Sequence, residues 1–211
     1  MNTEIIVIMD RSGSMEKIAT DAIGGFNALL TEQIDVPGEA RMSLVLFDHV
    51  VELRYEGVDV INVASLDKTT FVPRGMTALI DAIGETLTVQ KARIQKAKWA
   101  DTVIVAIITD GEENCSKTYT NMGVKELVQS CEDLGWKFIY MGANQDAFTV
   151  ASKYGISAAT GGVVASFDAT DIGTRSAYGS ISASVTLART SGINDADVDL
   201  FNSKPADRPF A

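Results

Sequence analysis

The chain has 211 residues, 46% of them hydrophobic, which is enough for one domain with a sizeable core. Its 18 basic and 28 acidic residues give a net charge of −10, which argues against nonspecific nucleic-acid binding and against docking on anionic membranes. No apolar run approaches the roughly 18 residues of a membrane-spanning helix. The first apolar strand begins near residue 4, which leaves no room for a signal peptide, so we expect a cytoplasmic protein.

Apolar runs alternate with helically spaced segments along the chain. Residues 4–9 predict a buried parallel strand, and an amphipathic helix follows over about 15–30. Two strands over 41–47 and 50–56, joined by a tight turn, predict an antiparallel pair at one edge of the sheet. The remaining predicted elements are a short helix near 60–66, a helix over 78–97, a strand over 102–109, a helix near 121–134, a strand over 137–142, a short helix near 145–154, a small strand near 162–167 and a helix near 169–189.

This order predicts an α/β fold with three layers, in which a doubly wound and mostly parallel sheet has helices on both faces. We expect residues 1–191 to form one domain. Residues 192–211 are polar and contain two prolines, so we expect a loosely held C-terminal tail.

Oxygen-bearing side chains follow two of the predicted apolar strands. The first strand runs directly into an Asp-x-Ser-x-Ser sequence formed by Asp10, Ser12 and Ser14. Asp110 ends a second apolar strand, and Thr77 lies at the start of a predicted helix. In open α/β sheets, ligands bind at the carboxyl ends of the strands. Carboxylate and hydroxyl oxygens suit a hard divalent cation, so the sequence predicts a metal site here.

Together these stretches resemble the von Willebrand factor A (vWA) family and its metal-ion-dependent adhesion site (MIDAS). The family pattern is Asp-x-Ser-x-Ser, then a distant Thr and a distant Asp, and the same five positions are filled here. As an order of elements the resemblance covers about residues 4–190. It implies a Rossmann-like vWA sandwich that binds Mg²⁺ or Mn²⁺, and a protein partner whose Asp or Glu completes the coordination. Compact stand-alone members occur in bacteria and their viruses.

Simpler roles exist for each residue taken alone. Asp10 could cap the strand end, Ser12 and Ser14 could be ordinary turn residues, and Thr77 could be a helix N-cap. All five oxygen donors are nevertheless expected at one sheet edge, which favours the metal site. An alternative function is a vWA subunit of a larger assembly linked to an AAA+ ATPase or to stress responses.

A metal-dependent hydrolase is the weaker alternative, and we expect no catalysis. A Ser-His-Asp hydrolase would need His49, the one histidine of the chain, which is expected to lie in a tight hairpin remote from Ser14. The Gly-x-Ser-x-Gly sequence of a nucleophile elbow is absent.

Several neighbours of the motif have two open interpretations. We expect Arg11 to point out of its loop, either as solvated surface or to steer an acidic partner. Glu112, Glu113 and Asn114 could tune metal affinity or could be a solvated loop. Three methionines, Met15, Met76 and Met122, could rim the site or pack in the core. The two cysteines, Cys115 and Cys131, are expected to be free thiols.

Overall fold

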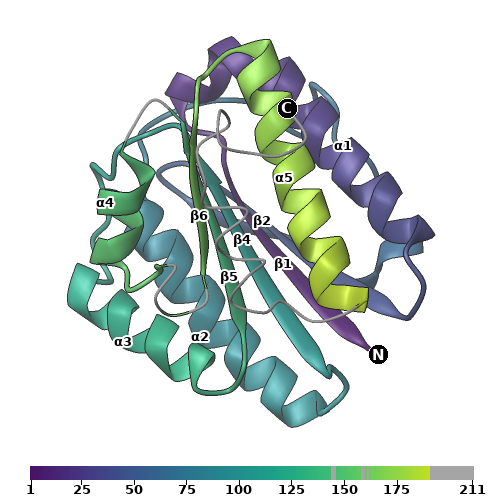
Figure 1. Cartoon of the computed structure of the whole chain (residues 1–211). Helices are drawn as coiled ribbons and strands as arrows, with labels where there is room; N and C mark the ends of the chain where they lie inside the picture. The colour runs from purple at the N-terminus through teal and green to yellow at the C-terminus, as the bar shows by residue number, and fades with distance from the viewer. Residues whose placement is uncertain (144–145, 158–159, 161, 191–211) are drawn as a thin grey trace.

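The computed structural model describes residues 1–143, 146–157, 160 and 162–190 (Figure 1). The described residues form a sheet of six strands in the order β3-β2-β1-β4-β5-β6. Among the described strands, only the β2–β3 pair is antiparallel, so the predicted antiparallel edge of a mostly parallel sheet is confirmed. The strands are β1 Thr3–Asp10, β2 Ala40–Phe47, β3 Val51–Asp59, β4 Thr102–Thr109, β5 Lys137–Ala143 and β6 Val163–Phe167.

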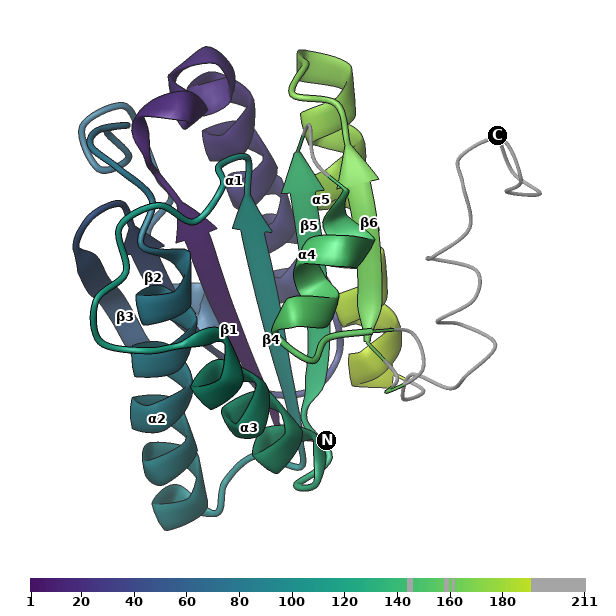
Figure 2. The same cartoon turned by 90° about the vertical axis from the view of Figure 1, so that its left-hand side faces the viewer.

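Helices cover both faces of this sheet (Figures 1 and 2). One layer holds α1 (Ala19–Asp35) and α5 (Asp171–Thr190), which pack against each other. The opposite layer holds α2 (Leu79–Ala97), α3 (Asn121–Glu132) and α4 (Ala147–Lys153). The predicted three-layer, doubly wound α/β fold is therefore confirmed.

Strand β1 shows why its sequence is an uninterrupted apolar run. Successive side chains of a strand point to opposite faces of the sheet. Ile5 and Val7 belong to the core under α1 and α5, whereas Ile6 and Ile8 belong to the core under α2 and α3. All four are fully buried. A strand that is covered on both faces has no position for a solvated side chain.

Two predicted helices differ in the structure. The first one is divided, because a 3-10 turn over Gly13–Ile18 precedes α1. The predicted helix near 60–66 is only a 3-10 turn over Val60–Asn62. Beyond that turn, the side chain of Asn27 in α1 bonds both the N–H and the C=O of Leu66, at 2.8 and 2.9 Å. The backbone of Leu66 therefore finds its partners in a side chain rather than in a helix.

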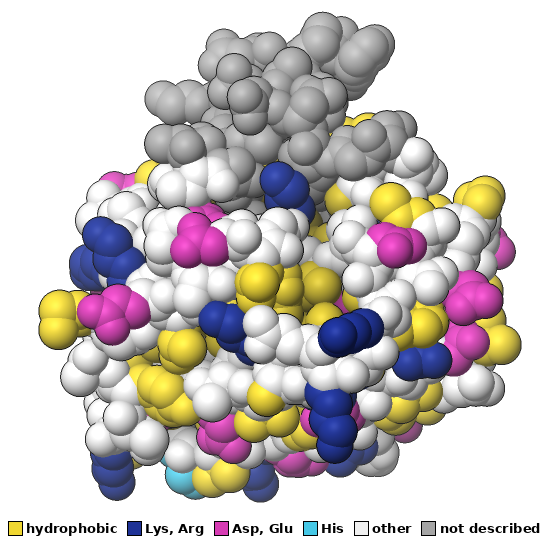
Figure 3. Space-filling model, turned by 90° about the horizontal axis from the view of Figure 1, so that it is seen from below, with side chains coloured by type: hydrophobic (Ala, Val, Ile, Leu, Met, Phe, Trp, Pro, Cys, Tyr) yellow, Lys and Arg dark blue, Asp and Glu magenta, His cyan; other side chains and the backbone are white. Residues whose placement is uncertain are grey.

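The ends and the surface complete the fold. The predicted tail over 192–211 lies outside the described residues, and the domain boundary at 191 stays a prediction. Among the described helices, none is both long enough and apolar enough to cross a membrane. Seen from below, charged side chains of both signs are interspersed with hydrophobic ones (Figure 3).

Candidate metal centre

Asp10 is the innermost of the predicted donors. It ends β1 and is fully buried. One carboxylate oxygen, Oδ1, accepts the backbone N–H of Ser12 at 2.6 Å, and Oδ2 accepts the hydroxyl of Thr109 at 2.6 Å. Asp10 therefore does cap the end of the strand, because it accepts a backbone N–H there. Thr109 was not among the predicted site residues, although it directly precedes Asp110 in the same motif.

The two serines and Asp110 form a chain of hydroxyl contacts. The Oγ atoms of Ser12 and Ser14 are 3.0 Å apart, and the hydroxyl of Ser14 donates to Asp110 Oδ1 at 2.7 Å. Ser12 occupies the N-cap position of the 3-10 turn, yet its side chain makes no capping bond. The Ser12 hydroxyl therefore faces Ser14 rather than serving the turn.

Gly111 marks the point at which oxygens of two other segments meet the loop after β4. A Cβ atom added to Gly111 would lie 2.8 Å from Thr77 Oγ1 and 3.3 Å from both Asp10 Oδ2 and Ser12 Oγ. Real Cβ atoms are essentially never found as close as 2.8 Å, so this space suits glycine. With the Ser12–Ser14–Asp110 contacts, the structure brings all the predicted donors together.

Thr77 is held by its backbone and is not the N-cap of α2. Its N–H donates to Asn114 Oδ1 at 2.9 Å, and its C=O accepts the N–H of Asn114 at 3.0 Å. Glu113 accepts the N–H of Ile80 at 2.9 Å, in the first turn of α2. Glu113 and Asn114 therefore attach the loop after β4 to the segment of Thr77, and they are not a merely solvated loop.

The acids of the site lie in a poorly hydrated environment. Burial raises the pKa of Asp10 to about 6, although the hydrogen bonds from Thr109 and Ser12 oppose that rise. Burial also raises the pKa of Asp110. A cation beside both acids would favour their charged forms. Within the described part of the chain, no three His, Cys, Asp or Glu side chains form a group that could hold a metal ion, so hydroxyl oxygens would have to complete a cation site. The donor set fits a hard divalent ion.

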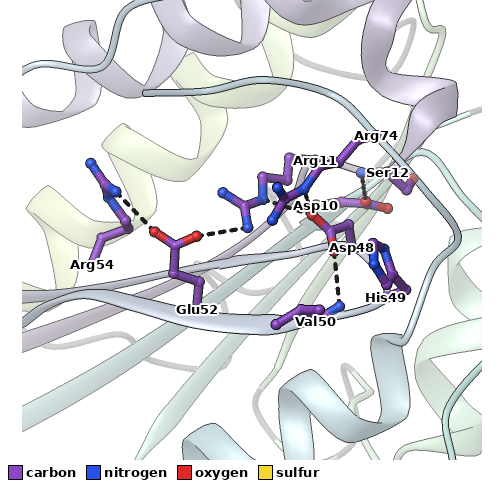
Figure 4. Close-up of polar contacts among 9 residues, drawn as sticks. All are labelled: Asp10, Arg11, Ser12, Asp48, His49, Val50, Glu52, Arg54 and Arg74. Carbon is purple, nitrogen blue, oxygen red and sulfur yellow. Dashed lines mark hydrogen bonds and ion pairs between the residues drawn. The ribbon is translucent and has the colours of Figure 1, made fainter. Parts of the chain in front are cut away.

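The structure contradicts one expectation for the neighbours and decides others. Arg11 does not point outward: its side chain is 6% exposed, with Nε 3.0 Å from Asp48 Oδ2 and Nη2 2.8 Å from Glu52 Oε2 (Figure 4). Met15 is buried core, whereas Met76 and Met122 are exposed. Cys115 and Cys131 are free thiols, as predicted.

The sequence matches no protein-family model and no curated protein. Solved structures do match the fold. A von Willebrand factor type A protein from Catenulispora acidiphila superposes with a TM-score of 0.63 at 15% identity, over 88% of this chain and 42% of that one. The von Willebrand factor domain of the type V pili tip protein Mfa5 from Porphyromonas gingivalis gives 0.63 at 12% identity, over 91% and 96%. The proximal thread matrix protein 1 of the mussel byssus, with a zinc-occupied MIDAS motif, gives 0.58 at 14% identity, over 85% and 46%.

These similarities establish the fold of this chain as that of vWA domains. The chain spans less than half the length of the Catenulispora protein and of the mussel protein.

Proposed function

We propose that this chain is a metal-dependent protein-binding module that binds one Mg²⁺ or Mn²⁺ through Asp10, Ser12, Ser14, Thr77 and Asp110. The observation that carries the proposal is the convergence of Thr77, Asp10 and Ser12 on the space beside Gly111. The vWA fold and the zinc-occupied MIDAS motif of the mussel protein support it. A cytoplasmic location and a bacterial or phage origin stay predictions.

The residues divide into two roles. The hydroxyl oxygens of Ser12 and Ser14 would contact the ion directly, and Thr77 would do so directly or through water. Asp10 is held by the Ser12 N–H and the Thr109 hydroxyl, so it would act mainly through water or by accepting hydrogen bonds from neighbouring groups. Asp110 would accept from Ser14, as it does here.

The partner would be a protein that presents an Asp or Glu to the site. When bound, a divalent ion with mostly neutral ligands supplies a concentrated positive charge that attracts an anionic oxygen. The chain carries a net charge of −10, so it would otherwise repel an acidic partner. We propose binding rather than catalysis, and phosphatase and esterase assays of the metal-loaded protein should find no turnover.

Isothermal titration calorimetry with Mg²⁺ and with Mn²⁺ tests the metal site. Wild type should bind one ion weakly, and the double variant Ser12→Ala/Ser14→Ala should not bind. Ser152→Ala/Ser176→Ala is the matched control, because it removes two exposed hydroxyls on α4 and α5. Saturable binding retained in Ser12→Ala/Ser14→Ala would refute the site.

Affinity capture tests the partner. Wild type with Mg²⁺ should retain a protein that is lost with chelator and lost from Ser12→Ala/Ser14→Ala, whose net charge equals that of wild type. Substituting each Asp and Glu at the partner's contact surface should reveal one whose loss abolishes binding. Binding that resists chelator would rule out the metal-dependent mechanism.

A further inference from the structure

Asp48 is a fully buried acid that the proposed donor set does not use. It lies in the turn between β2 and β3. Its Oδ2 contacts Nε of Arg11 at 3.0 Å and Nε of Arg74 at 2.8 Å, and its Oδ1 accepts the N–H of Val50 at 2.8 Å. Figure 4 shows both guanidinium groups directed toward this one carboxylate.

The two arginines come from the two segments that carry the hydroxyl donors. Arg11 lies between Asp10 and Ser12, and Arg74 precedes Thr77 by three residues. Backbone hydrogen bonds join the same segments, because the N–H of Arg74 donates to Arg11 C=O at 2.9 Å. Two further bonds support the contact: Gly13 N–H donates to Gly75 C=O at 3.2 Å, and Ala78 N–H donates to Asp48 C=O at 2.8 Å.

The charges make this arrangement depend on Asp48, because Glu52 also pairs with Arg11 but Asp48 pairs with both arginines. A buried guanidinium needs a compensating charge, and Arg11 is almost fully buried. Burial alone would raise the pKa of Asp48, but the hydrogen bonds from Arg74 and Val50 and the charge of Arg11 leave that pKa below its ordinary value. Asp48 therefore stays ionised at neutral pH and pairs with both arginines at once. His49 Nδ1, 3.0 Å from Oδ1, faces the same carboxylate.

We propose that Asp48 is a positioning residue of the metal site. By pairing with Arg11 and Arg74 it holds the Ser12–Ser14 loop and the Thr77 segment at the separation at which their hydroxyls can share one ion. Groups that orient metal ligands commonly change metal affinity by about 10–100-fold when they are substituted. The inference rests on the proposed metal site for its affinity effect, but its effect on the two segments exists without metal.

Asp48→Asn is the direct test, because it keeps the size of the side chain and an acceptor for Val50 N–H but removes the charge. Its affinity for Mn²⁺, measured by calorimetry, should fall by about 10–100-fold. In the metal-free protein, hydrogen exchange at the amides of Gly13, Arg74 and Ala78 should become faster. Glu4→Gln is the matched control, since Glu4 is another buried acid, paired with Arg93 at the opposite end of β1. It should change neither quantity.

The outcomes separate the two proposals. If wild type binds no Mn²⁺, the proposed function fails, while the metal-free exchange data still decide whether Asp48 holds the segments. Wild-type affinity and exchange in Asp48→Asn would overturn the inference, and so would an equal loss of affinity in Glu4→Gln. If Asp48→Asn does not fold, Arg74→Gln replaces it, because Arg74 is half-exposed and its loss buries no unpaired arginine. That variant should still lower the affinity and speed the same exchange.

Discussion

Gly111 is the residue at which a single methyl group should abolish the site. In Gly111→Ala, the added Cβ would lie 2.8 Å from Thr77 Oγ1, so the hydroxyl or the loop must move. We expect metal affinity to fall by at least about tenfold, as for other changes that displace metal ligands, measured by calorimetry. Gly24→Ala is the control: an added Cβ on this exposed α1 glycine would meet nothing within 4 Å. Unchanged affinity in Gly111→Ala would contradict the proposed geometry.

Asp110 should be dispensable for folding but required for binding. Burial raises the pKa of this half-buried carboxyl, which means that keeping it charged costs free energy in the absence of a cation. We therefore expect the free energy of unfolding of chelated Asp110→Ala to stay within about 1 kcal/mol of wild type, or to rise, while partner binding is lost. Glu112→Ala removes the adjacent exposed acid and should keep binding. Urea unfolding together with affinity capture distinguishes the two variants, and a large loss of stability would make Asp110 structural.

Some residues of the site could be predicted from the sequence and others could not. The donor residues could be named because their types and strand-end positions are local features of the sequence. The environment of Arg11 could not, because its counter-charges lie on the β2–β3 turn and on β3, and no local pattern reveals a partner 37 residues away. Thr109 is different, since its place beside Asp110 at the end of an apolar strand was a signal that could have been used.

At the scale of elements, α1 and α5 pack closely through a glycine. A Cβ added to Gly25 would overlap the buried ring of Tyr178 on α5, whereas Gly24 has open space. Gly25→Ala should therefore destabilise the protein by about 1–3 kcal/mol. Gly24→Ala should stabilise it by about 0.5–1 kcal/mol, because alanine loses less backbone entropy in a helix. Urea unfolding measures both changes, and the same sign for the two variants would contradict this packing.

The loop after β4 is attached to α2 by a second acid. Asp81 accepts the N–H groups of Lys117, Thr118 and Tyr119 at 2.8 to 2.9 Å. Burial raises the pKa of Asp81, but these three hydrogen bonds together lower it by more than burial raises it. The pKa of Asp81 therefore lies below its ordinary value. The stabilisation by ionised Asp81 is thus fully present above the pKa that this carboxyl has in the unfolded chain, about 4. It is lost as the pH falls through the lower pKa that Asp81 has in the folded protein.

Asp81→Asn should show this pH dependence directly. We expect it to destabilise the protein by about 1–3 kcal/mol at pH 7, and the difference from wild type should shrink as the pH falls below about 4. Glu85→Gln, which removes an exposed acid from the same helix, should follow the wild-type pH profile. Chemical unfolding at a series of pH values measures the difference, and a constant difference would show that the three hydrogen bonds do not depend on the charge.

At the scale of the molecule, the layered α/β arrangement could be anticipated because alternating strands and helices leave few ways to bury every apolar face. The predicted strand over 102–109 coincides with β4. The predictions failed where contacts distant in sequence replace local ones. Gly13 bonds the backbone of Gly75 beside the first turn, and Asn27 bonds Leu66 where a helix was expected. Both exceptions bring the segment before α2 against α1 or against the 3-10 turn that precedes it.

Stabilisation of this chain by Mg²⁺ can have two sources. One is the proposed site, and the other is the net charge of −10, because divalent ions also stabilise acidic proteins without a specific site. A site filled at ten times its dissociation constant stabilises the native state by about 1.4 kcal/mol. For a chain of this size that raises the melting temperature by about 3–6 °C. Ser12→Ala/Ser14→Ala keeps the net charge. It should therefore retain the rise in melting temperature that comes from nonspecific binding of Mg²⁺ and lose the rise that comes from the site.

Thermal unfolding of both proteins with increasing Mg²⁺, and with NaCl at matched ionic strength, separates these contributions. The Mg²⁺-dependent rise of wild type should exceed that of Ser12→Ala/Ser14→Ala and should saturate, because a single site fills. The rise in NaCl should be equal in the two proteins, since screening depends on the total charge rather than on two hydroxyls. Equal rises in Mg²⁺ would mean that the ion acts only on the acidic surface, and the convergence of hydroxyls at Gly111 would then have no role in binding it.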